Sequence, residues 1–164
     1  MSQPLRVTAV CSGNICRSPI AEYVLRAAVE GAGLSHAIVV DSAGVGAWHV
    51  GEGADRRSVA VLAKHGYDGS AHRVQQITRA WFDAPDAPDL LLAMDSSHDD
   101  ALRRMAPDAD IRLMRSFDPG LADGAGAALD VPDPYYGNGD GFEHVLQMIQ
   151  RATPGVVDYL KRQL

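Results

Sequence analysis

Two residues that can act together on a phosphate lie early in the chain. Cys11 and Arg17 open and close a short run, Cys-Ser-Gly-Asn-Ile-Cys-Arg, with five residues between them. A curled loop of this length can place the cysteine sulfur beneath a bound tetrahedral oxyanion and the guanidinium across its oxygens, because the planar fork of arginine donates two hydrogen bonds to a phosphate. A thiolate in line with the phosphorus is a nucleophile. The pattern therefore predicts transfer of a phosphoryl group to Cys11.

The run and Ser18, which follows it, are together called the phosphate loop (residues 11–18). The segments on either side of this loop predict an anion site. The apolar run Leu5–Val10 precedes it, and apolar residues at helical spacing follow from Ile20. We expect Ser18 at the helix N-cap and Pro19 at the first helical position. Such a junction directs backbone N–H groups into one concavity at the positive end of the helix dipole, which favours an oxyanion and a thiolate. A lone cysteine is more often a small buried hydrophobe, but the complete loop favours the chemical role. The other predicted loop residues are Ser12, Gly13, Asn14, Ile15, Cys16 and Ser18.

A candidate general acid lies in residues 130–137, which we call the acid loop. Phosphoryl transfer from an aryl ester needs a proton for the departing oxygen. Asp133 lies between Pro132 and Pro134, which stiffen its position, and two tyrosines follow. An Asp-Pro pair alone is more often a turn. Beside the phosphate loop, it predicts that Asp133 is the acid.

These motifs resemble the low-molecular-weight protein tyrosine phosphatases over essentially the whole chain. The phosphate loop, the Asp-Pro-Tyr-Tyr-Gly run and the intervening Asp41–Gly44 match in order, and Trp48-His49 resembles the bacterial members. The resemblance implies an α/β fold with a parallel sheet ordered 2-1-3-4. It also implies hydrolysis of phosphotyrosine through a phosphocysteine on Cys11, with Arg17 as phosphate clamp.

The resemblance implies two further groups of residues. One is a hydrogen-bond network that fixes the phosphate loop, and the other forms the walls of a substrate slot. Taken singly, these residues also fit a turn, an exposed loop histidine or simple loop packing. The network comprises Asn14, Ser18, Ser42 and His72; the walls are Trp48 with His49 and, opposite, Tyr135 with Tyr136.

The elements that must position these residues alternate between short apolar runs and helix-length patterns, which is typical of a parallel α/β sheet. We predict a single domain over residues 1–164, with helices on both faces of a four-stranded sheet and the phosphate loop after the first strand. A Pro154-Gly155 pair is expected to break or kink the last helix. The predicted strands are Leu5–Val10, Ala37–Val40, Leu90–Met94 and Ile111–Met114; the predicted helices are Ile20–Ala32, Arg57–His65, Ser97–Met105 and a stretch from Phe142 toward Leu160.

Composition and charge limit the kinds of molecule that this protein is expected to bind. Hydrophobic residues make up 46% and charged residues 22% of the chain, as in ordinary globular proteins. The formal charge of -6 predicts repulsion of nucleic acid and anionic lipid. No apolar run is long enough to span a bilayer or to act as a signal peptide, so we expect a cytoplasmic protein, most simply a monomer. The expected partners are a tyrosine-phosphorylated protein as substrate and inorganic phosphate as product, without a metal or other cofactor.

Three related activities and one binding role compete with this interpretation. Phosphoarginine phosphatases share the fold, but that branch tends to carry threonine where this loop has Ile15. A thiol-dependent arsenate reductase needs further cysteines downstream, and none follows Cys16. A phosphocysteine carrier of a sugar transport system has no role for Arg17 and Asp133. A phosphotyrosine-binding module would need neither nucleophile nor acid.

Cys16 has two possible roles. It shares the phosphate loop with Cys11, so it can be a resolving thiol that captures an oxidised nucleophile as a disulfide. The alternative is that Cys16 only packs behind the loop.

Overall fold

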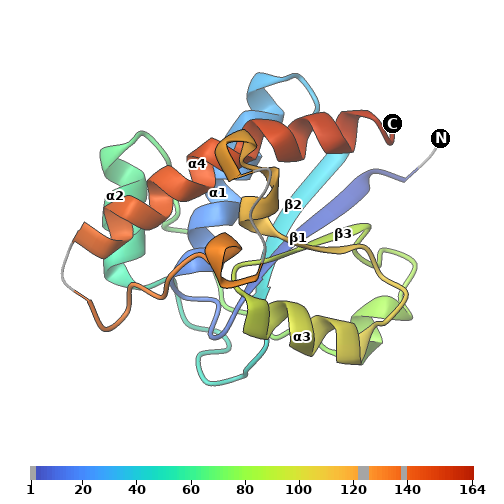
Figure 1. Ribbon diagram of the computed structural model, residues 1–164, viewed down its shortest axis with the longest axis horizontal. Coiled ribbons are helices and arrows are strands. Elements are labelled where there is room, and N and C mark those ends of the chain that lie inside the picture. Colours follow the sequence, from blue (N-terminus) through green and yellow to red (C-terminus); the bar gives the residue numbers. More distant parts are fainter. Residues whose placement is uncertain (1–2, 122–125, 138–139) are drawn as a thin grey trace.

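The computed structural model describes residues 3–121, 126–137 and 140–164. Its centre is a four-stranded parallel sheet in the order β2-β1-β3-β4, which confirms the predicted fold class and strand order (Figure 1). The strands are β1 (Leu5–Cys11), β2 (Ile38–Gly44), β3 (Leu90–Ala93) and β4 (Ile111–Leu113).

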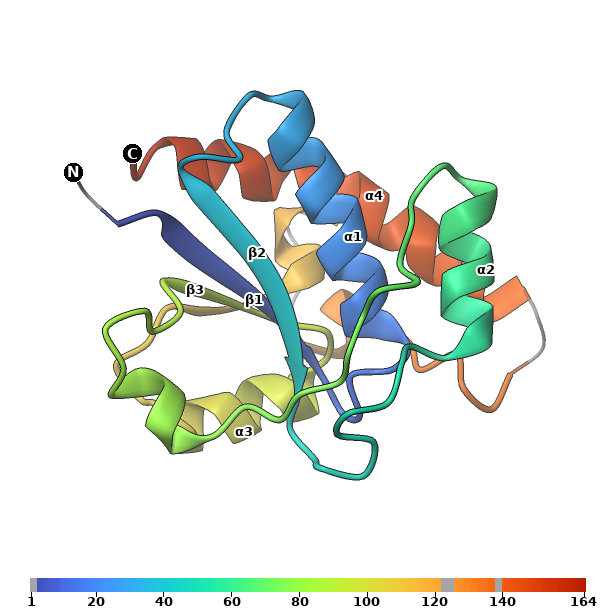
Figure 2. The same cartoon turned by 180° about the vertical axis from the view of Figure 1, so that it is seen from behind.

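Helices cover both faces of the sheet, as predicted. α1 and α4 pack on one face with α2 beside them, while α3 lies on the other face (Figure 2). The helices are α1 (Arg17–Gly31), α2 (Arg56–Lys64), α3 (Ser96–Met105) and α4 (Asp140–Lys161). Short 3-10 helices connect them at Arg79–Phe82, Met114–Phe117, Pro119–Leu121 and Gly126–Leu129.

The two layers have separate apolar cores because successive side chains of a strand point to opposite faces. Val7 and Ala9 of β1 belong to the core under α1 and α4, whereas Val10 belongs to the core that contains Leu102 of α3. All three strand residues are fully buried. A strand buried on both faces explains the continuous apolar run in the sequence.

The parallel register sets the place of the nucleophile. β1 pairs with β2 on one side and β3 on the other, and Cys11 lies opposite Gly44 at the carboxyl end of both strands. In open parallel sheets, ligands bind beyond the carboxyl ends of the strands, where the chain diverges to the two sides. The phosphate loop therefore starts at the position that the fold favours for a ligand.

Of the break or kink predicted in the last helix, the break is wrong. α4 continues through Pro154 to Lys161, because Val156 and Leu160 after the proline are fully buried in the main core. Packing of this face offsets the missing proline N–H. Gly155 serves close packing, since a Cβ there would collide with the carbonyl oxygen of Phe117.

The helices in the described ranges are all too short or too polar to traverse a bilayer.

Candidate active site

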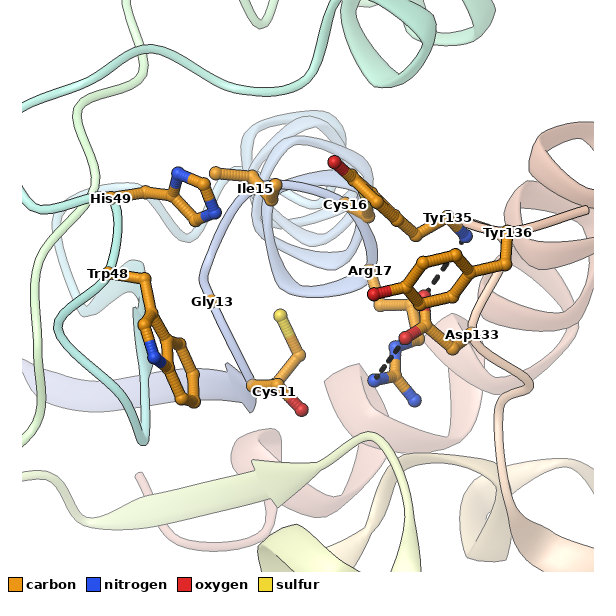
Figure 3. Close-up of a pocket in the computed structure, with 11 residues that line it drawn as sticks. Cys11, Gly13, Ile15, Cys16, Arg17, Trp48, His49, Asp133, Tyr135 and Tyr136 are labelled. Atoms are coloured by element: carbon orange, nitrogen blue, oxygen red, sulfur yellow. Dashed lines mark hydrogen bonds and ion pairs between the residues drawn. The ribbon is translucent and has the colours of Figure 1, made fainter.

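A pocket of about 520 Å³ lies at the carboxyl end of β1, where the phosphate loop meets the acid loop (Figure 3). It brings together most of the predicted site residues, although they are far apart in the sequence. Its lining consists of Cys11, Ser12, Gly13, Ile15, Cys16, Arg17, Trp48, His49, Asp133, Tyr135 and Tyr136.

The residues that follow β2 hydrogen-bond to the backbone of the phosphate loop. The backbone N–H of Val45 donates to the carbonyl of Cys11, and that of Gly46 donates to the carbonyl of Ser12, both at 2.9 Å. A Cβ at Gly44 would lie 2.9 Å from the Ser12 oxygen and 3.0 Å from the Gly13 carbonyl carbon. The glycine that ends the Asp41–Gly44 motif therefore permits the close approach of loop and strand.

Asn14 fixes the bend of the phosphate loop. Its φ of 60° lies in the left-handed region, which asparagine adopts more readily than most residues. Its buried side chain donates to the hydroxyls of Ser18 (2.8 Å) and Ser42 (2.9 Å) and accepts from the backbone N–H of Gln75 (3.1 Å). The Asn14 carbonyl accepts a further bond from His72 Nε2 at 2.9 Å. Asn14 thus brings the four predicted network residues together.

Ser18 is not the helix N-cap, which corrects the prediction. α1 begins at Arg17 with Cys16 as the N-cap, and no side chain caps this end. The Ser18 hydroxyl lies 2.9 Å from Cys11 Sγ instead. Because it accepts from Asn14 Nδ2, its own proton can be donated to the sulfur or to the carbonyl of Ala43, which is farther away at 3.5 Å. The helix end is left open toward the pocket, as an anion site requires.

A buried carboxylate completes the network and was not predicted. Glu22 is only 5% exposed, and its Oε1 accepts from the Ser42 hydroxyl at 2.5 Å. The same oxygen lies 3.5 Å from His72 Nδ1, and Arg26 pairs with the other oxygen. Sequence could have indicated this role, because Glu22 interrupts an otherwise apolar helix face, and acids are rarely buried without a partner.

Arg17 is held in place by the opposite side of the pocket. Its Nη1 donates to Asp95 Oδ2 at 2.7 Å and to the carbonyl of Val131 at 2.9 Å. The residue is 3% exposed, so its pairing with a carboxylate lowers the cost of burying the charge. Arg17 Nη2 lies 3.8 Å from Asp133 Oδ2, which joins clamp and predicted acid in one site (Figure 3).

Asp95 is a second residue that sequence reasoning missed as part of the site. It caps α3 through the N–H groups of Ser97 and His98. Its additional bond to Arg17 follows from its place just after β3, whose end adjoins that of β1. Burial alone would raise the pKa of Asp95, but the hydrogen bond from Ser97 and the interaction with Arg17 contribute in the opposite direction, and the pKa lies below its usual value.

His98 of α3 contacts the phosphate loop. It is 2% exposed, and its Nε2 lies 2.9 Å from the Ser12 hydroxyl, while Nδ1 accepts from the backbone N–H of Asp95. This assigns the proton to Nε2, which donates to Ser12. Burial lowers the pKa of His98 to about 4, so the ring is neutral at pH 7.

The substrate slot has aromatic residues on two sides. Trp48 and His49 stand on one side of the pocket, and Tyr135 and Tyr136 on the other (Figure 3). Trp48 is 73% and Tyr136 90% exposed, so both can contact a partner. The tyrosine rings meet edge to face with their centroids 4.8 Å apart. The arrangement can hold a flat ring above the thiol.

Cys16 is a buried thiol behind the loop. It is 5% exposed and packs in the main core. Burial, followed by the nearby charge of Asp55, raises its pKa to about 12. Cys16 is therefore protonated at neutral pH and is a weak nucleophile. Within the described ranges, no group of three or more His, Cys, Asp or Glu side chains is arranged to hold a metal ion.

Comparison with known proteins agrees with this geometry. The family model for "Low molecular weight phosphotyrosine protein phosphatase" matches residues 6–164. A low molecular weight protein-tyrosine-phosphatase of Streptomyces coelicolor is 52% identical over 97% of this chain and 95% of its own. A low molecular weight protein-tyrosine phosphatase A of Mycobacterium tuberculosis is 45% identical over 100% and 96%. The crystal structure of a protein tyrosine phosphatase from Entamoeba histolytica superposes with a TM-score of 0.86 at 29% identity, covering 97% of this chain and 98% of that one.

Proposed function

The chain belongs to the low molecular weight phosphotyrosine protein phosphatase family, and from that premise we propose that it hydrolyses phosphotyrosine in proteins through a phosphocysteine on Cys11. It is a phosphatase, and its family implies phosphoprotein substrates. The observation that carries the proposal is the convergence of Cys11, Arg17 and Asp133 on one pocket. We treat residues 1–164 as one catalytic domain.

In the first step, the Cys11 thiolate attacks phosphorus and the bond from phosphorus to the tyrosine oxygen breaks. Arg17 and the backbone N–H groups of the phosphate loop bind the equatorial oxygens, where charge is concentrated in the transition state. Asp133 gives its proton to the departing phenolic oxygen. Its distance of 3.8 Å from the Arg17 guanidinium supports this role, because an acid must stand at the edge of the bound phosphoryl group.

In the second step, water attacks the phosphocysteine. The Asp133 carboxylate accepts a proton from that water, the bond from sulfur to phosphorus breaks, and inorganic phosphate leaves. The hydroxyl of Ser18, 2.9 Å from Cys11 Sγ, stabilises the returning thiolate. The network through Asn14 keeps this hydroxyl in place.

The slot favours an aryl phosphate. Its aromatic walls complement a phenyl ring, and Ile15 adds an apolar side chain to the lining. An arsenate reductase or a phosphocysteine carrier fits less well. The chain has no cysteine beyond Cys16 for a disulfide relay, and a carrier would not need an acid beside Arg17.

Rapid quenching with a phosphotyrosyl peptide, followed by mass spectrometry of peptic fragments, tests the proposal. We expect phosphate on the fragment that contains Cys11 in the wild type and in Cys16→Ser, and none in Cys11→Ser. Cys11→Ser should still bind vanadate or phosphate, because the loop and Arg17 remain. A phosphoarginyl peptide run in parallel should turn over much more slowly. Residual activity of Cys11→Ser within about tenfold of the wild type would contradict the assignment, because a serine hydroxyl is a far weaker nucleophile than a thiolate.

A further inference from the structure

Asp55 and Arg57 form a polar link between the two loops of the pocket, which we call the Asp55–Arg57 strut. Asp55 caps α2, and its backbone N–H donates to the carbonyl of Ile15 at 2.8 Å. Its Oδ1 accepts from Arg57 Nε and its Oδ2 from Arg57 Nη2, both at 3.0 Å. Ser58 adds a bond to the carbonyl of Cys16 at 3.3 Å. The start of α2 and the head of Arg57 are thus fixed to the phosphate loop.

The other edge of the same guanidinium holds the acid loop. Arg57 Nη1 donates to the carbonyl of Tyr135 at 3.0 Å. The guanidinium carbon also lies 5.2 Å from the ring centre of Tyr135 and 4.6 Å from that of Phe142, within the range of cation–π attraction. The backbone N–H of Tyr135 donates to Asp133 Oδ1 at 3.0 Å. An unbroken series of bonds therefore runs from Ile15 through the strut to the carboxylate of Asp133.

Asp133 needs such support because it is exposed and its contact with Arg17 Nη2, at 3.8 Å, is long. Its side chain is 46% exposed, whereas that of Arg17 is 4% exposed. A general acid must stay within hydrogen-bond reach of the departing oxygen, and a displacement of about 1 Å can cost up to 100-fold in rate. We propose that Arg57 is a positioning residue. It fixes the distance between the carboxyl group of Asp133 and the phosphate loop without touching the reacting atoms.

This inference rests on the proposed function, since it assigns to Arg57 an effect that passes through the acid. It makes a specific demand on kinetics. Loss of Arg57 should slow the step that needs a proton and should leave oxyanion binding alone. A residue that contacted the substrate peptide would instead change KM, and a merely structural residue would affect good and poor leaving groups equally.

The test compares Arg57→Met, which keeps an apolar stem, with Arg56→Met as the matched control on the same turn of α2. Arg56 is exposed. The kinetic constants are measured with phenyl phosphate, whose phenol is a poor leaving group, and with dinitrophenyl phosphate, whose dinitrophenolate departs without a proton. We expect Arg57→Met to lower kcat/KM, which reports the first step, for phenyl phosphate by about 10- to 100-fold and for dinitrophenyl phosphate by less than about threefold. The inhibition constant of vanadate and all constants of Arg56→Met should stay unchanged.

A second background separates positioning from structural damage. In Asp133→Asn, the further change Arg57→Met should lower the rate very little, because the side chain that Arg57 positions can no longer act as an acid. Arg57→Lys keeps the charge but not the planar fork, so its kcat/KM should lie between those of the wild type and Arg57→Met. If Arg57→Met does not fold, Arg57→Lys replaces it in the comparison of the two substrates.

Three outcomes would overturn the inference. They are equal losses on both substrates, equal losses in both backgrounds, and a raised KM with unchanged kcat. The proposed function fails separately: if Asp133→Asn shows no dependence on the leaving group, the acid assignment falls and the inference with it. If Asp133→Asn shows that dependence and Arg57→Met does not, only the role of Arg57 is refuted.

Discussion

The phosphate loop is buried or half-buried at each of its eight positions, whereas Asp133, Tyr135 and Tyr136 in the acid loop are exposed. Two strands, a helix N-terminus and the network around Asn14 support the phosphate loop. The start of the acid loop is attached through Asp130, which accepts from Ser96 and Arg115, and through Val131, whose N–H donates to Met94 and whose carbonyl accepts from Arg17. Its tyrosine end is attached through the Asp55–Arg57 strut. Oxyanion binding is therefore preorganised by the fold, and proton transfer depends on a few separable contacts.

The sharpest test of this contrast is removal of the acid itself. Asp133→Asn should lower kcat/KM, which reports the first step, by about 10³-fold for a poor leaving group such as phenol, because protonation by a positioned acid contributes that much. The loss should be far smaller for nitrophenol, which departs as a stable anion. Steady-state rates across a series of aryl phosphates measure the difference. Asp130→Asn and Asp140→Asn are neighbouring controls without that dependence, and equal losses across the series would place the acid elsewhere.

A second experiment changes the clamp. Arg17→Lys should lower kcat/KM by about 10²–10³-fold, because an ammonium cannot replace the bidentate fork or keep both bonds to Asp95 and Val131. The loss should be similar for good and poor leaving groups, unlike that of Asp133→Asn. Rates and vanadate inhibition are both measured, and near-normal turnover would contradict the role of Arg17 as clamp.

A third experiment loosens the network under the nucleophile. Asn14→Ala should lower the free energy of unfolding by about 2–4 kcal/mol, since it removes three buried side-chain bonds and places alanine, which tolerates the left-handed region less well than asparagine, at positive φ. Urea denaturation measures this change. Asn14→Gly keeps the bonds broken but accepts the backbone angle, so it should recover about 1 kcal/mol. If alanine and glycine destabilise equally, the backbone angle carries no cost.

The fourth prediction concerns pH. Because the pKa of His98 falls from 6.5 to about 4 on folding, the unfolded chain binds this proton first as the pH decreases. The stability that neutral His98 provides is complete above pH 6.5 and is lost progressively toward pH 4, by at most about 3 kcal/mol. His98→Gln, which can still accept from Asp95 and donate to Ser12, should flatten this part of the curve. Denaturation of both proteins across pH 4–7 tests it, and parallel curves would assign the dependence to other groups.

The smallest expected effect on initial activity is that of Cys16→Ser. This variant should start nearly as active as the wild type but regain less activity with dithiothreitol after exposure to peroxide, if Cys16 captures oxidised Cys11. With its pKa raised to about 12, Cys16 should perform this capture faster as the pH increases. Recovery is measured at two pH values, and equal recovery of the two proteins would leave Cys16 as packing.

Sequence was most informative where local pattern decides structure. The apolar runs predicted all four strands, and the motifs around Cys11 and Asp133, with the family resemblance that they carry, predicted most of the residues that line the pocket. Partners brought together only by the fold were missed: Glu22 under Ser42, Asp95 against Arg17, and His98 against Ser12. Such pairs depend on which strand ends adjoin, and no local pattern carries that information.

Two predictions failed because tertiary contacts outweighed local preference. Ser18 fits an N-cap by residue type, but its hydroxyl contacts the thiol of Cys11. Pro154 predicted a break in α4, but burial of Val156 and Leu160 keeps the helix continuous. Local rules describe average environments, and both residues lie where packing is dense.

The bond between Arg17 and the carbonyl of Val131 joins residues 114 positions apart. During synthesis, the phosphate loop emerges early, yet the guanidinium of Arg17 lacks this partner until most of the chain has left the ribosome. Parallel sheets with such distant contacts fold slowly, since long loops must close before the contacts form. Recovery of enzymatic activity after dilution from denaturant should therefore lag behind the return of helical circular dichroism, and the lag reports the closure of this long loop.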